Sequence, residues 1–170
     1  MAQLDSTVIY GNLKVTGDVY GYRVYGAVYN AGNDYAEYRL CRDILAPGYI
    51  VTEDETDCDY VKLCKTKKPK GKCFVISDTY ATCIGDELSA LPVALTGRVL
   101  VYPEKDCKFK VGDKVGVSTR GKARKIGRVE SLLHPDRVIG TVSSIPNYNL
   151  WVTAKKEAID VDGRIWVNLK

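Results

Sequence analysis

Two carboxylates that could do acid–base chemistry stand in the segment 30–38, NAGNDYAEY. Asp34 and Glu37 follow Asn33 within five residues whose other members are tyrosine and alanine. Two carboxyl groups can divide the roles of acid and base when their surroundings separate their pKa values. In an extended strand, positions 34 and 37 point to opposite faces, so the pair meets only if the chain bends at Asp34 or a neighbouring subunit supplies one carboxylate. The simpler alternative is a Gly-Asn-Asp turn capped by Asp34, with Glu37 as a solvated strand residue.

Other reactive side chains lack the spacing of known sites. The single histidine, His134, precedes Pro135 with no catalytic motif around it, which disfavours a hydrolase that pairs it with serine or cysteine. No pair of the six cysteines has the C-x2-C spacing of a zinc site, so we expect no metal and no cofactor. Free thiols are the default state, and disulfides are the alternative.

Basic residues concentrate in two runs, KTKKPKGK (65–72) and RGKARKIGR (120–128), although the net charge is only +4. Such runs can bind phosphate backbones, which keeps a nucleic-acid-binding β domain as an alternative. No aromatic residue interleaves with the cations as base stacking requires. Proline and glycine in the runs favour solvated hairpin tips, and we expect no nucleic-acid partner.

The overall composition is that of an ordinary globular protein. The chain has 170 residues, of which 45% are hydrophobic and 27% charged, and this length fits one domain. No run approaches the roughly 20 apolar residues of a transmembrane helix, and the N-terminus has no apolar core of a signal peptide. Tyrosine outnumbers phenylalanine 12 to 2, and the abundance of tyrosine, valine, threonine and glycine favours strands.

Glycine spacing divides the chain into an arm, residues 1–32, and a compact β domain, residues 33–170. The arm carries only short β-prone pieces between its glycines, which cannot bury a core alone. It must lie on the following domain or associate with copies of itself.

Alternating apolar residues and turn signals predict a barrel or a sandwich for the domain. The expected strands are 35–41, 49–52, 60–64, 73–77, 97–102, 114–118, 138–143 and 164–169. One-turn helices are expected near 54–58 and 129–133, and Asp162-Gly163 predicts a two-residue hairpin. The predicted core residues are Val99, Val101, Val115, Val117, Ile139 and Val142.

Several short motifs together resemble a known family. They are the glycine-rich stretch 11–26, the motif NDYAEY (33–38), APG (46–48), ALTGRV (94–99), FKVGD (109–113), GKA (121–123) and VIGTV (138–142). Residues 10–170 resemble the C-terminal intramolecular chaperone and autoprocessing domain of phage tail fibres, tail spikes and neck appendages.

The resemblance implies a homotrimer in the virion, made in the host cytoplasm, with itself and other virion structural proteins as partners and no membrane. Some family members cut their own backbone before the Asp of a D-x-x-E pair, which maps here to the Asn33–Asp34 bond with Asp34 and Glu37 as the acidic pair. A tethered peptide has a high effective molarity, which favours such a reaction. Cleaving members carry serine where this chain has Asn33, and a neutral amide is a weaker nucleophile. We therefore expect a structural trimer without efficient self-cleavage, and an active autoprotease is the alternative.

Overall fold

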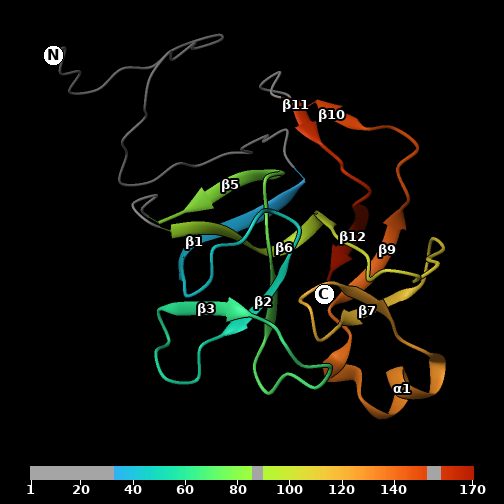
Figure 1. Cartoon of the computed structure of the whole chain (residues 1–170), viewed down its shortest axis with the longest axis horizontal. Helices are drawn as coiled ribbons and strands as arrows, with labels where there is room; N and C mark the ends of the chain where they lie inside the picture. The colour runs from blue at the N-terminus through green and yellow to red at the C-terminus, as the bar shows by residue number, and fades with distance from the viewer. Residues whose placement is uncertain (1–32, 86–89, 153–157) are drawn as a thin grey trace, which may run out of the picture.

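Strands dominate the part of the chain that the computed structural model describes, residues 33–85, 90–152 and 158–170. They make up 47% of these residues and helices 7%, which confirms the predicted all-β class. Figure 1 shows the described strands, with the short helix α1 (Arg128–Leu133) at the lower right, below β7. The predicted arm, residues 1–32, lies outside the described residues.

Five strands close the barrel in the order β1–β3–β2–β4–β6–β1. Their bounds are Asp34–Cys41 (β1), Ile50–Glu53 (β2), Tyr60–Leu63 (β3), Cys73–Ile76 (β4) and Ala90–Val101 (β6). The ring closes because β1 pairs antiparallel with β6 along most of its length and parallel with β3 at its last two residues. Outside the ring, β5 (Tyr80–Ile84) runs parallel to the first half of β1.

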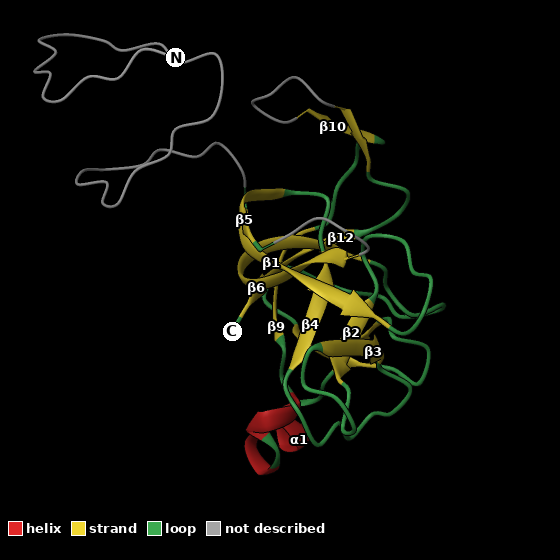
Figure 2. Ribbon diagram, turned by 90° about the vertical axis from the view of Figure 1, so that its left-hand side faces the viewer, coloured by secondary structure: helices red, strands yellow, loops and turns green. Residues whose placement is uncertain are grey.

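The second half of β6 extends the sheet away from the barrel. It pairs with β12 (Ile165–Leu169), and the order continues through β9 (Gly140–Ser144), β7 (Lys114–Val117) and β8 (Ala123–Lys125). A separate two-stranded sheet consists of β10 (Leu150–Val152) and β11 (Ala158–Asp160). Figure 2 places this small sheet at the opposite end of the molecule from α1, which is followed by the 3₁₀ turn η1 (Pro135–Arg137).

Aliphatic side chains from both halves of the sheet form one continuous core cluster. All six predicted core residues are at most 9% exposed, which confirms the prediction; they are Val99, Val101, Val115, Val117, Ile139 and Val142. Val99 and Val101 in β6, like Val115 and Val117 in β7, lie two residues apart and therefore share one face of their strand.

One of the two predicted helices forms. The helix α1 matches the prediction near 129–133 and ends at His134, before Pro135. The prediction of a helix at 54–58 is wrong, because Asp54 Oδ1 accepts hydrogen bonds from the N–H (2.8 Å) and the hydroxyl (2.7 Å) of Thr56. This side chain stabilises a turn that competes with a helix.

The Asp162-Gly163 turn is present, but the predicted hairpin is wrong. Both residues have positive φ, 44° and 69°, and the N–H of Arg164 donates to the carbonyl of Val161 at 2.8 Å. The strands on either side do not pair with each other, since β11 pairs with β10 while β12 pairs with β6 and β9. The turn therefore redirects the chain from one sheet to the other.

The two basic runs differ in structure. Residues 65–72 connect β3 to β4, and both strands pair with β2 between them, so this run is not the predicted hairpin tip. Residues 120–128 cover the β7–β8 turn, β8 and the start of α1. Within this second run, Arg124 is half-buried and binds both carboxylate oxygens of Glu130, at 2.6 and 3.0 Å. Part of the second run is therefore structural.

Candidate functional site at the Asn33–Asp34 junction

The backbone of Asn33 is fixed on both sides by hydrogen bonds to distant segments. Its N–H donates to the carbonyl of Thr79 at 3.1 Å, and its carbonyl accepts the N–H of Arg98 at 2.7 Å. Its side-chain Nδ2 is buried and has no hydrogen-bond partner among the described residues. The carbonyl of the Asn33–Asp34 bond, the bond predicted to be cut, thus already accepts one backbone hydrogen bond. Contacts of this kind stabilise an oxyanion.

Gly97 gives the Asn33–Asp34 peptide the space that it needs. A Cβ at position 97 would lie 2.6 Å from the carbonyl oxygen of Asn33 and 2.7 Å from the Cα of Asp34, and Gly97 has a φ of +105°. Both the close approach and the positive φ require glycine. Gly97 is also the residue at which β6 changes partner from β1 to β12, so the pairing of β6 switches at the same residue that leaves room for the junction.

The carboxyl group of Asp34 is buried, with the side chain only 4% exposed. Its Oδ1 accepts a hydrogen bond from the hydroxyl of Thr79 at 3.0 Å, and its Oδ2 has no partner among the described residues. The Thr79 hydroxyl lies 3.3 Å from that of Ser77. Desolvation raises the pKa of Asp34 to about 6, although the Ser77 and Thr79 hydroxyls lower it and the charge of Asp78 adds to the increase. Asp34 can therefore hold or release a proton near neutral pH.

Glu37 lies in different surroundings from Asp34. Its side chain is 41% exposed and its carboxylate lies 3.6 Å from the guanidinium of Arg39. It is not among the groups that shift the pKa of Asp34. Within one chain, Asp34 and Glu37 thus lie on opposite faces of β1 and make different contacts. The catalytic pairing of Asp34 with Glu37 stays a prediction, in which a neighbouring copy supplies one of them.

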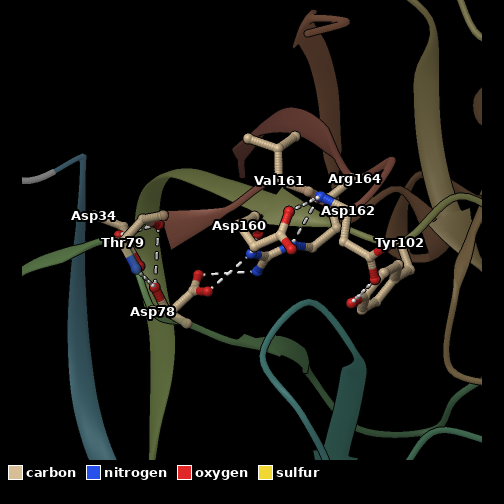
Figure 3. Close-up of polar contacts among 9 residues, drawn as sticks. Asp34, Asp78, Thr79, Tyr102, Asp160, Val161, Asp162 and Arg164 are labelled. Atoms are coloured by element: carbon tan, nitrogen blue, oxygen red, sulfur yellow. Dashed lines mark hydrogen bonds and ion pairs between the residues drawn. The ribbon is translucent and has the colours of Figure 1, made fainter. Parts of the chain in front are cut away.

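An ion pair beside the junction holds the loop that carries Thr79 (Figure 3). Asp78 accepts two hydrogen bonds from the guanidinium of Arg164, both at 2.9 Å. Arg164 is 4% exposed and also donates to the backbone carbonyls of Asp160 and Val161. A planar guanidinium with two matched contacts fixes orientation as well as distance. Arg164 therefore attaches the loop after β4 to the turn between β11 and β12.

The same turn is attached to β6 through Tyr102. The phenol hydroxyl of Tyr102, the residue after β6, donates to Asp162 Oδ2 at 2.8 Å. Desolvation, together with this hydrogen bond, raises the pKa of Tyr102 to about 12. Figure 3 shows the contacts side by side, from the start of β1 to the turn at Asp162. Hydrogen bonds thus join four segments that are far apart in sequence: the start of β1, the loop after β4, the end of β6 and the turn between β11 and β12.

The sequence motif NDYAEY marks the junction, but its partners in the fold carry no signal of their own. Gly97 and Arg98 occur in a motif of the resemblance without an assigned role, and Ser77, Asp78 and Thr79 carry only the composition of a turn. His134 directly follows α1, and its N–H donates to the carbonyl of Glu130 at 2.8 Å. Among the described residues, no group of three or more potential metal ligands gathers, and no helix is long and apolar enough to cross a bilayer.

Comparison with known proteins adds no relative: no family model, no curated protein and no solved structure matches the chain.

Proposed function

We propose that the protein is a structural component of a phage particle, a homotrimer in a fibre or appendage. In this proposal residues 33–170 drive trimerisation and folding, and the partners are copies of the same chain and other virion structural proteins. The motif resemblance over residues 10–170 supports it, as does an uncovered apolar surface on β10. The protein is made in the host cytoplasm, resides in the virion and uses no cofactor.

The apolar surface on β10 is the observation that carries the proposal. Leu150 and Val152 are 60% and 59% exposed, and Tyr148 just before the strand is 41% exposed. Trp151 between them packs edge-on against Trp166, with ring centroids 5.3 Å apart. One face of β10 thus packs on its own domain, and the other face is exposed in the part of the chain that the structure describes. Apolar patches of this kind mark interaction surfaces.

The position of this surface suits an assembly role. Both views place the β10–β11 sheet and the first residues of β1 toward the same end of the molecule (Figures 1 and 2). Asn33 is fixed there by its two backbone hydrogen bonds. Copies that associate through β10 would therefore bring their junctions, and the chain that precedes them, to one end of the assembly.

Charge placed on this surface tests the proposal. Leu150→Asp combined with Val152→Asp should convert trimers to monomers, because two carboxylates would be desolvated in the interface. Leu132→Asp combined with Leu133→Asp is the matched control, since both leucines are about 70% exposed on α1 at the opposite end. Light scattering reads the molar mass of each variant. A trimer that survives the first pair of changes but not the second contradicts the assignment of this surface.

Self-cleavage at Asn33–Asp34 is a second candidate function, favoured by the geometry of the junction. The Asn33 carbonyl already accepts the N–H of Arg98, and Asp34 is a buried acid with a pKa of about 6 next to that bond. A proton donor at this place could assist the departure of the new amine. Asn33 offers only a neutral amide, which is a weak nucleophile. We therefore rank self-cleavage second.

A further inference from the structure

We propose that a hollow between the end of β3 and the β7–β8 turn is a docking site for an acidic segment of a partner protein, one with aliphatic side chains between its carboxylates. The hollow has a volume of about 710 Å³. Its lining comes from three places in the chain: the loop after β1 (44–49), the end of β3 (63–65) and the β7–β8 turn (119–122). The described lining does not include β10, so this inference goes beyond the proposed assembly.

The two basic runs of the sequence meet at this hollow. Lys65 is the first residue of the run 65–72, and Arg120 and Lys122 begin the run 120–128. All three line the hollow, whereas no carboxylate does so among the described residues. Cations that gather without carboxylates between them attract an anionic partner.

Two of these cations are open to solvent. The side chains of Lys65 and Arg120 are 70% and 71% exposed. Lys65 lies 3.7 Å from a carboxylate oxygen of Asp43, and Arg120 lies 3.5 Å from one of Glu104. Exposed ion pairs of this kind contribute little to stability. Exchanging them for the carboxylates of a partner therefore costs little.

The walls of the hollow beside the cations are aliphatic. Ile44, Leu45 and Ala46 come from the loop after β1, and Leu63 is the last residue of β3. Ile44 is fully exposed. An exposed aliphatic side chain at the edge of a cationic hollow offers a contact to an apolar side chain of a partner. Apolar walls with a few charged groups are typical of a binding site.

Backbone contacts hold the walls of the hollow in place. The N–H of Ile50 in β2 donates to the carbonyl of Gly121 in the β7–β8 turn at 2.7 Å. A Cβ at position 121 would lie 2.9 Å from the carbonyl oxygen of Ile50, and Gly121 has a φ of +64°. The turn therefore lies directly against the barrel. A site that is formed before its partner arrives loses less entropy on binding.

The lining favours a peptide over a nucleic acid. Tyr49 is the one aromatic residue of the described lining. Its ring packs against Tyr102, with centroids 5.4 Å apart, and the ammonium group of Lys122 lies 5.7 Å from its centroid. One ring that already has these contacts does not make the row of stacking surfaces that single-stranded nucleic acids use. The aliphatic walls suit the side chains of a peptide instead.

Fluorescence anisotropy with a labelled acidic peptide tests the inference on the full-length protein. The probe contains glutamates interrupted by leucines, and the control probe has glutamine in place of each glutamate. The glutamate probe should bind about tenfold more tightly or better, and added salt should weaken it because exposed charges are screened. Lys65→Glu combined with Arg120→Glu should weaken binding by about tenfold. Lys108→Glu combined with Arg128→Glu is the matched control, since both residues are exposed and outside the described lining, and should bind like the wild type.

A second pair of variants tests the aliphatic wall without changing charge. Ile44→Ser should weaken binding of the glutamate probe by about fivefold. Val111→Ser, at a valine that is 67% exposed elsewhere, should not. The inference is overturned if the glutamate probe does not bind, if the two charge-reversed proteins lose affinity equally, or if Ile44→Ser binds like the wild type. Binding of a single-stranded DNA probe in place of the peptide would assign the hollow to nucleic acid. A lower molar mass of Lys65→Glu with Arg120→Glu would assign it to a second copy of the chain, and both results contradict the inference.

Discussion

The hydroxyl of Thr79 donates a 3.0 Å hydrogen bond to the carboxyl group of Asp34, a residue 45 positions earlier in the chain. This contact joins the first residue of β1 to the loop that follows β4. The other carboxyl oxygen is buried with no partner among the described residues. A buried acid that is only half satisfied lowers stability whenever it is charged, and the junction therefore carries a cost that the rest of the fold offsets.

Replacing Asp34 by asparagine should remove a pH dependence of stability. Burial raises the pKa of Asp34 from 3.8 to about 6, so between these values the folded protein binds more protons than the unfolded chain. Stability is therefore lost as pH rises through this window, by up to ~3 kcal/mol. Urea unfolding should show Asp34→Asn more stable than wild type above pH 6 and equal to it near pH 4. Parallel curves for the two proteins at all pH values would refute the raised pKa.

Gly97→Ala should destabilise the domain by at least ~2 kcal/mol. The new Cβ would lie 2.6 Å from the Asn33 carbonyl oxygen and would force an alanine into a φ of +105°. Gly112→Ala is the matched control, because Gly112 has a φ of +88° but nothing within 4 Å of the added atom. The control should cost about 1 kcal/mol, from backbone strain alone. Equal losses in the two variants, measured by chemical denaturation, would mean that the junction does not depend on the close approach.

Arg164→Met should cost about 3 kcal/mol, because it leaves the Asp78 carboxylate without its two contacts in a partly buried place. The comparison is Arg120→Met, which removes an exposed pair with Glu104 at 3.5 Å and should cost less than about 1 kcal/mol. Thermal unfolding of the two variants measures the difference. If Arg164→Met is as mild as Arg120→Met, the ion pair does not hold the Thr79 loop.

The Asn33–Asp34 bond should be largely intact in the wild-type protein, and Asn33→Ser should accelerate its cleavage if the assembly builds the family's site. Adding Glu37→Gln to that variant should slow cleavage by about 10²–10⁴-fold if Glu37 acts as a general acid or base. Intact mass under denaturing conditions, after a day at about 37 °C, reads the cleavage directly. If the wild type yields two fragments, the protein is an active autoprotease. If Asn33→Ser stays uncut, the junction has only a structural role.

Local sequence signals predict the fold better than the site. The strands β7, β9 and β12 follow from their β-branched and aromatic residues between turn signals, which is a local property. The first half of β6 contains Pro92, and β10 and β11 have only three residues each. None of these three segments therefore has a strand pattern in the sequence. Closure of the barrel depends on the pairing of β1 with β6, strands about 60 residues apart.

The contacts of the junction are also non-local. NDYAEY marks the position of Asp34 in the sequence, but the hydroxyl that it binds comes from Thr79, 45 residues later. The pKa of Asp34 depends on burial, and burial is decided by strands that no spacing within the motif predicts. The alternation rule does anticipate that Asp34 and Glu37 face opposite ways, as their different contacts in the structure reflect.

The molar mass of the untagged full-length protein in solution tests the central proposal most directly. Sedimentation equilibrium at micromolar concentration should give three times the chain mass of 18.8 kDa, because the proposal requires three copies associated through their uncovered apolar surfaces. A single species of 18.8 kDa across the concentration range would contradict it.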